Sequence, residues 1–211
     1  MVDTYSLEQL FTLAFPQLDT TGQQQAKTLY QSLASGKAIS IEDFSKKINL
    51  PASETEQLLN SWTGVIFDDK NNITAFWGLS TTPTTHRFFI NDIELFTWCA
   101  WDLLFMPHIL QQTVKTETRC PITDTSIQLT ISEQCIEQVS PPEAMITFIK
   151  PDLDALKQNV TGSFCQYIFF VASEAAGKQW QQQQENGFLL SMDQGYRLGE
   201  NIIKKVFNDI Q

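Results

Sequence analysis

The sequence predicts an α+β protein with a helical N-terminal part and a mixed α+β core. Helical patterns dominate the beginning of the chain, whereas strand-like runs dominate the stretch between about 113 and 171. Helices and strands do not follow the repeated strand–helix–strand order of a parallel sheet. The 211 residues are 42% hydrophobic and include fifteen Phe and five Trp, enough for a packed core. We therefore expect a winged-helix-like structural subdomain over residues 1–80 and a mixed α+β catalytic core over residues 81–211.

In the first part, apolar residues at helical spacing predict four helices, over residues 5–15, 22–34, 41–48 and 53–62. Ser40 is expected to cap the third helix, and Ser53 with Glu56 has the spacing of a capping box for the fourth. Two apolar segments, 65–67 and 73–77, flank a polar turn and predict a β-hairpin. Short helices joined by a tight turn and followed by a hairpin are typical of a winged helix.

A winged helix raises the question of DNA binding, and the charges argue against it. The helix in the recognition position, residues 53–61, carries two Glu and no Lys or Arg. Residues 1–80 contain five Lys and Arg against nine Asp and Glu, and the whole chain has a formal net charge of −10. Because DNA is held mainly by basic side chains on its phosphates, we expect no nucleic-acid partner. The first part is therefore expected to be structural.

In the second part, short apolar or alternating runs predict strands over residues 86–90, 113–119, 126–132, 144–149, 164–171 and 188–191. A helix is predicted around Cys99, and Pro107 is expected to bound it. Further helices are predicted over residues 152–159, 174–184 and 198–210. Ser173 is expected to cap the helix that starts at residue 174.

Nothing in the sequence predicts export or a membrane span. The first residues lack a basic segment followed by an apolar one, so we expect no secretory signal. No run reaches the roughly 18 apolar residues that cross a membrane, and the run from Leu95 to Leu110 contains Asp102 and Pro107. The four cysteines are too few for a disulfide scaffold. We therefore expect a cytoplasmic protein with free thiols and no membrane partner.

The apolar run Leu95–Pro107 places Cys99 and Asp102 three residues apart among Phe, Trp and Leu side chains. At that spacing the thiol and the carboxylate share one face of a helix, close enough to exchange a proton. A helix cap at Asp102 would bury a charge, so we do not expect this residue to be a cap. Cys165 lies in a second apolar, strand-like run. Two buried thiols and one acid can hold a soft metal ion and protonate a group attached to it.

These segments resemble the alkylmercury lyases, also called organomercurial lyases. Leu95–Pro107 is similar to the first active-site motif of that family, with Cys99 and Asp102 on its catalytic positions. Ser163–Ser173 is similar to the second motif, with Cys165 on the remaining catalytic position. The order and approximate spacing of the motifs hold from about residue 25 to the C-terminal helix. The resemblance therefore covers nearly the whole chain.

The remaining cysteines and the two histidines receive no catalytic role. Cys120 lies in a segment similar to a third cysteine segment of the family, where the resemblance implies a structural role. Cys135 has no counterpart that we identify. Some members carry a second Cys directly after the one at the Cys165 position, and this chain has Gln166 there. His86 and His108 lie next to apolar runs without metal-ligand spacing, so we expect them to be ordinary.

The resemblance implies an enzyme that cleaves a carbon–mercury bond by protonolysis and gives a hydrocarbon and Hg(II). Cys99 and Cys165 would hold mercury as thiolates, because a soft metal prefers soft sulfur ligands. Asp102 would take up the proton released by a thiol and deliver it to carbon. No cofactor is implied, since mercury arrives as substrate and leaves as product. Small cellular thiols would release the product, and a mercuric reductase is implied as the partner that receives it.

Two other functions stay open on the residues alone. Cys99 and Cys165 could sequester a soft metal such as Hg or Cu without catalysis, although sequestration has no need of the acid at Asp102. The chain could also be a winged-helix regulator that senses metal through these cysteines, and the acidic helix over residues 53–61 argues against that function.

Overall fold

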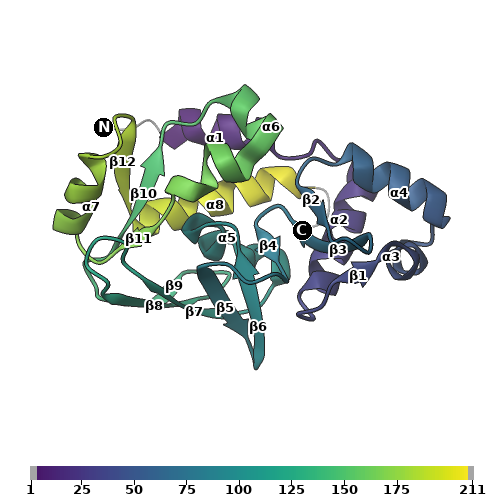
Figure 1. Cartoon of the computed structure of the whole chain (residues 1–211), viewed down its shortest axis with the longest axis horizontal. Helices are drawn as coiled ribbons and strands as arrows, with labels where there is room; N and C mark the ends of the chain where they lie inside the picture. Colours follow the sequence, from purple (N-terminus) through teal and green to yellow (C-terminus); the bar gives the residue numbers. More distant parts are fainter. Residues whose placement is uncertain (1–3, 209–211) are drawn as a thin grey trace.

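The computed structural model describes residues 4–208 and has an α+β fold, as the sequence predicts (Figure 1). Its N-terminal part contains four helices, namely α1 (Thr4–Ala14), α2 (Thr20–Leu33), α3 (Ile41–Ile48) and α4 (Ala52–Ser61). The strands of this part are β1 (Ile39–Ser40), β2 (Val65–Phe67) and β3 (Asn72–Phe76). Strand β3 lies antiparallel between β1 and β2, so the predicted hairpin is confirmed.

The helix starts in this part test the predicted caps. Ser40 accepts a hydrogen bond from the backbone N–H of Asp43 at 3.1 Å, which confirms the cap of α3. The prediction at Ser53 is wrong, because α4 already begins at Ala52 and has no side-chain cap. Pro51 occupies the cap position there, and its ring fixes a backbone angle that suits the start of a helix.

A large antiparallel sheet continues into the core through β4 (Leu79–Ser80), β5 (His86–Ile90), β6 (Ile93–Thr97), β7 (Val114–Arg119), β8 (Ser126–Ile131) and β9 (Ile136–Ser140). The strand order is β1-β3-β4-β6-β5-β7-β8-β9, with β2 paired to β3. Strand β4 pairs with both β3 and β6, so a single sheet joins the N-terminal part to the core. The sequence pattern misses three of these strands. Strand β4 is very short, β6 merges with the apolar run before the next helix, and β9 is largely exposed.

A second sheet consists of β10 (Met145–Ile149) between β11 (Phe170–Val171) and β12 (Gly187–Ser191), all antiparallel. The remaining helices are α5 (Ala100–Leu110), α6 (Leu153–Ser163), α7 (Glu174–Gln181) and α8 (Met192–Val206). Figure 1 shows α1, α6 and α8 lying together, with α5 beneath α8. These four helices enclose the region where the apolar core is richest in aromatic rings.

Helix α5 is buried on every side. All of its residues except His108 are buried, which fits a helix that is apolar all round. The prediction that Pro107 bounds this helix is wrong, because the helix continues for another turn to Leu110. A proline removes a single backbone donor, and the packing of a fully buried helix compensates for that loss. Gln111 ends the helix in a left-handed conformation with φ 54°.

Two further helix boundaries differ from the prediction. Helix α7 ends at Gln181, although Ser173 caps its start by accepting the N–H of Ala176, as expected. Helix α8 begins at Met192 rather than 198, because Ser191 supplies a capping box upstream of the apolar pattern. The predicted end of this helix at residue 210 lies outside the described residues. Between residues 4 and 208, no helix is both long and apolar enough to cross a membrane.

Candidate active site

Cys99 and Asp102 meet at the start of α5. Cys99 is the last extended residue before the helix, with φ −148° and ψ 173°, and Asp102 is in the first turn. The Asp102 carboxylate accepts the backbone N–H of Cys99 at 2.8 Å, and the Cys99 sulfur accepts the backbone N–H of Asp102. This is a capping box in which cysteine takes the place usually held by serine or threonine.

Two sequence predictions about this pair are corrected. Cys99 does not lie inside the helix, because the residues before it form β6 and the helix begins at Ala100. Asp102 does act as a cap, which the apolar pattern argued against. The predicted closeness of the thiol and the carboxylate nevertheless holds, since residues at the cap and third helical positions face each other.

Cys165 reaches the same point from another segment. It follows α6 in a short 3₁₀ turn, Cys165–Tyr167, so the predicted strand over residues 164–171 is wrong except at Phe170–Val171. A short apolar run does not by itself distinguish a buried strand from a buried turn. The backbone N–H of Ala100 donates to the carbonyl of Ile168 at 3.3 Å, and this bond joins the two segments.

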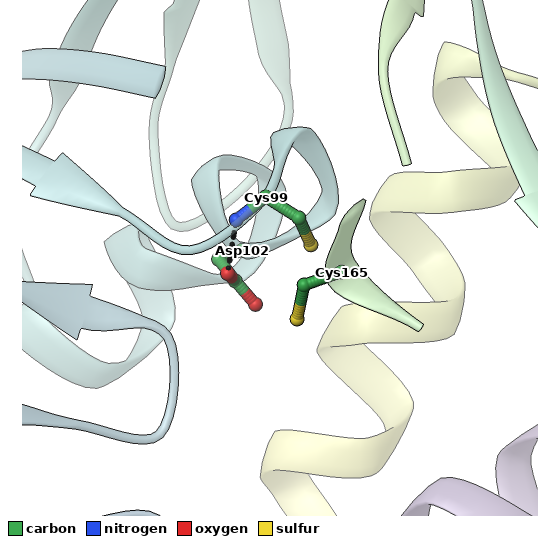
Figure 2. A group of neighbouring side chains, drawn as sticks. All are labelled: Cys99, Asp102 and Cys165. Carbon is green, nitrogen blue, oxygen red and sulfur yellow. Dashed lines mark hydrogen bonds between the residues drawn. The ribbon is translucent and has the colours of Figure 1, made fainter. Parts of the chain in front are cut away.

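The three side chains converge, as Figure 2 shows. Their ligand atoms all lie within 4.8 Å of one another, and among the described residues they form the one such group of three or more potential metal ligands. Cys99 is 0% exposed, Cys165 is 4% exposed and Asp102 is 6% exposed. Water therefore does not screen the charges of these groups, and the proton positions depend on their mutual contacts.

Burial and contacts within the group set its protonation. Burial raises the pKa of Asp102 to about 7, although hydrogen bonds from Cys99 partly oppose the rise. Burial raises the pKa of Cys99 well above its usual range, and its hydrogen bond to the Cys165 sulfur and the charge of Asp102 add to that rise. The same hydrogen bond lowers the pKa of Cys165, but burial and Asp102 outweigh it, so the net shift is upward. Near neutral pH the site therefore holds thiols beside an acid that can either carry or accept a proton.

An apolar cavity lies beside the three groups. Asp102 and Cys165 line it together with aromatic rings, namely Phe11 of α1, Phe15 directly after α1, Trp101 and Phe105 of α5, and Phe164 directly after α6. The Trp101 indole N–H donates to the carbonyl of Gly195 at 2.9 Å, which fixes this ring in α5 against α8. The free volume is only ≈ 20 Å³, which is room for about one water molecule.

Sequence reasoning missed the turn that holds Asp102 in place. Trp77 and Gly78 join β3 to β4, with φ 29° and 89°. An added Cβ at Gly78 would lie 2.8 Å from Cγ of Asp102, so only glycine allows the carboxyl group to pack there. The buried Tyr30 hydroxyl donates to the carbonyl of Trp77 at 2.9 Å and secures the turn from α2. A glycine directly after an apolar strand is the signal for such a close approach.

With this geometry in view, comparisons with known proteins define the class. A sequence profile of the alkylmercury lyase family, MerB, matches residues 79–204. An alkylmercury lyase of Staphylococcus epidermidis is 28% identical over 176 residues, which is 83% of this chain and 80% of that protein. An alkylmercury lyase of Bacillus cereus is 30% identical over 173 residues, covering 82% and 78%. The chain therefore belongs to the alkylmercury lyase family, and it is an enzyme of that family.

A solved structure shares the fold. The mercury-bound form of MerB2 superposes with a TM-score of 0.80 and covers 96% of this chain and 99% of that one. The sequence identity is 19%, so this likeness concerns the fold alone. It extends across residues 20–80 as well as the core, because nearly the whole chain is superposed.

Proposed function

We propose that this chain cleaves the carbon–mercury bond of organomercurials by protonolysis at Cys99, Cys165 and Asp102. The observation that carries the proposal is the buried Asp102, whose pKa of about 7 suits proton transfer in both directions, in contact with two thiols. A site that only sequestered a metal would be served by the thiols alone. The membership of the family supports the same chemistry.

The contacts support an order of proton transfers. A cysteine thiol displaces the thiol that carries the organomercury cation, and its proton leaves with that carrier. The second thiol then adds to mercury as a thiolate. Cys99 touches both the Cys165 sulfur and Asp102, so its proton passes to the carboxylate. Asp102 delivers this proton to the carbon as the carbon–mercury bond breaks, which yields a hydrocarbon and Hg(II) held by two thiolates.

The apolar cavity would hold the organic group. Its aromatic walls suit alkyl and aryl groups and exclude the water that would compete for the proton. A free volume of ≈ 20 Å³ is too small for a phenyl ring, so the substrate has to displace side chains as it binds. Phe11 is the wall residue that α1 supplies, and its ring centroid lies 4.5 Å from that of Trp101 and 4.8 Å from that of Phe164.

The N-terminal part and the partners complete the proposal. We infer that the winged-helix-like structural subdomain predicted over residues 1–80 is built by β1, α3, α4 and the β2–β3 hairpin, which follow one another in that order, whereas α1 packs against α6 and α8 of the core. No Lys or Arg lies in α4, which supports the expectation that this subdomain does not bind DNA. Small thiols would remove Hg(II) by exchange in a reducing cytoplasm, and a mercuric reductase would receive it.

A turnover experiment tests this function. Reduced protein is incubated with phenylmercury or methylmercury and excess small thiol, and benzene or methane is measured by headspace gas chromatography. Hydrocarbon is expected over many turnovers, and Cys99→Ser and Cys165→Ser should abolish it. Cys135→Ser is the matched control, because Cys135 is exposed and outside the site. Asp102→Asn should bind phenylmercury and release no benzene.

The outcomes separate the competing functions. Normal turnover by Asp102→Asn would overturn the role given to the acid. Tight mercury binding by the unaltered protein without hydrocarbon would indicate thiol-based sequestration instead. A gel shift of duplex DNA at low salt that responds to mercury would indicate a winged-helix regulator.

A further inference from the structure

A third buried thiol, Cys120, lies outside the proposed active site in a different environment. It directly follows β7 and is 2% exposed. Burial raises its pKa, but hydrogen bonds from the Thr123 hydroxyl and from the backbone N–H groups of Ala172, Ile122 and Thr123 outweigh burial, so the net shift is downward. Several N–H groups directed at one atom form a nest for an anion. These hydrogen bonds therefore stabilise the thiolate form of Cys120.

A buried histidine shares the face of the sheet with this thiol. Arg87 of β5 pairs with Glu117 of β7, so continuation of the register places His86 opposite Thr118 and diagonal to Cys120. His86 is 3% exposed, and its Nδ1 has no hydrogen-bond partner. Burial lowers its pKa to about 4, so the imidazole is neutral at physiological pH. A neutral imidazole is a common metal ligand.

Both side chains line the same cavity, whose volume is ≈ 720 Å³. The rim carries opposite charges, with Arg87 beside Glu117 and Arg119 beside Asp124. Because these charges are paired with one another, they do not favour an anionic or a cationic organic ligand. The distinguishing groups of the cavity are therefore the sulfur of Cys120 and the imidazole of His86.

We propose that Cys120 and His86 form a second mercury site, which holds Hg(II) between a thiolate sulfur and an imidazole nitrogen. Thiolates select soft metal ions and imidazole accepts many metals. Two ligands satisfy Hg(II), which is commonly two-coordinate, whereas a structural Zn²⁺ site needs four. Organomercury has one open position and would need the thiolate alone. The site needs no oxidant or reductant, because Hg(II) stays divalent: two Hg–S bonds to the carriers break, one bond to the Cys120 sulfur and one to the His86 nitrogen form, and the two carriers leave as thiolates that take up any proton of Cys120 or protons from water.

This site goes beyond the proposed cleavage and does not depend on it. The resemblance implies a structural role for Cys120, and the cavity adds a binding role. The site also lies close to the first one, because His86 pairs with Thr97 of β6 and the Thr97 hydroxyl donates to the carbonyl of Cys99 at 2.9 Å. Hg(II) that leaves the two thiolates of Cys99 and Cys165 would meet the sulfur of Cys120 at a short distance.

The test uses full-length protein in which Cys120 is the one remaining cysteine, made by Cys99→Ser, Cys135→Ser and Cys165→Ser together. HgCl2 is titrated into this protein while the sulfur-to-mercury charge-transfer absorption is followed, and the ligands are identified by X-ray absorption at the mercury edge. One Hg(II) per chain with one sulfur and one nitrogen ligand is expected. In the same background His86→Phe should weaken binding at least about tenfold, since even indirect changes at metal sites cost 10- to 100-fold.

A matched variant at His108 and the imidazole ¹⁵N resonances give two further tests of the His86 ligand. His108→Phe in the same background should bind Hg(II) as before, because His108 also has a buried nitrogen without a partner but lies in another cavity. If His86→Phe does not fold, the imidazole ¹⁵N resonances of the background protein report on the same bond and should shift with one equivalent of HgCl2. Absence of binding, or a sulfur-only site that ignores His86→Phe, would overturn the proposal. Hydrocarbon release by the unaltered protein is measured separately. Failure of the Cys120 site in this titration can therefore be distinguished from failure of the proposed cleavage.

Discussion

The Cys99–Cys165 pair and the Cys120 cavity both bury thiols, yet their surroundings shift the thiol pKa in opposite directions. Around Cys99, burial, a second thiol and a carboxyl group oppose the charged form, and they outweigh the single backbone N–H of Asp102 that favours it. Around Cys120 three backbone N–H groups and a hydroxyl point at the sulfur and favour the thiolate. The cavities differ as well, with ≈ 20 Å³ beside Asp102 and ≈ 720 Å³ beside Cys120.

This comparison shows that burial alone does not decide the state of a thiol. The number of donors that replace the lost water decides it. A site that keeps its thiols protonated needs a base nearby before it can bind mercury, and in the proposed mechanism Asp102 is that base. A site that already stabilises a thiolate needs none, which suits binding rather than proton transfer.

The largest expected effect concerns Asp102 and the pH dependence of stability. Its pKa is 3.8 in an unfolded chain and about 7 in the folded protein, so between these pH values the folded state holds a proton that the unfolded state has released. The stability contribution of this group therefore falls as pH rises through that window. Asp102→Asn cannot titrate, so its stability relative to the unaltered protein should increase from pH 4 to pH 7 by up to about 4 kcal/mol.

Urea unfolding of both proteins at several pH values measures this difference. Contributions from the other titrating groups cancel when the two curves are subtracted at each pH. A difference that stays constant between pH 4 and pH 7 would mean that burial does not hold a proton on Asp102, and the contrast between the two thiol environments would lose its basis.

The next effect concerns thiol reactivity. Only thiolates react readily with iodoacetamide, so the pH profile of alkylation reports the pKa of each cysteine. Cys120 should reach half of its maximal rate below pH 9.0, whereas Cys99 and Cys165 should do so above it. At pH 8 we therefore expect Cys120 to carry more thiolate than Cys99 and to be alkylated at a larger fraction of its maximal rate.

Mass spectrometry of peptides after timed alkylation follows each cysteine separately. The profile rather than the absolute rate is compared, because the two sites differ in access. In urea all three cysteines should share one profile, which is the control. Identical profiles in the folded protein would remove the distinction drawn here.

The family of the chain and the closeness of its three predicted site residues could be predicted from the sequence, and the local structure less well. Cys99, Asp102 and Cys165 lie together as their motifs indicate, because chemistry restricts which residue types occupy those positions. Cys165 lies in a turn rather than in the predicted strand, since an apolar run looks alike in both. The placement of His86 diagonal to Cys120 depends on strand register, which no local pattern contains.

The smallest expected effect comes from the turn behind Asp102. Gly78→Ala introduces a Cβ that would lie 2.8 Å from the Asp102 carboxyl carbon, at a residue with φ 89°. The carboxyl group has to move. A shift of about 1 Å in a catalytic group can reduce turnover up to about 100-fold, so we expect a loss of roughly tenfold in benzene release from phenylmercury.

Gly36→Ala is the matched control for backbone strain, because Gly36 has φ 78° and its added Cβ would contact the side chain of Ile93 instead. Both variants should lose about 1 kcal/mol of stability from the left-handed backbone, but only Gly78→Ala should lose turnover. Because Cys120 lies away from this turn, its alkylation profile should be unchanged in both variants. Equal loss of turnover in the two variants would mean that strain, rather than the placement of Asp102, limits the reaction.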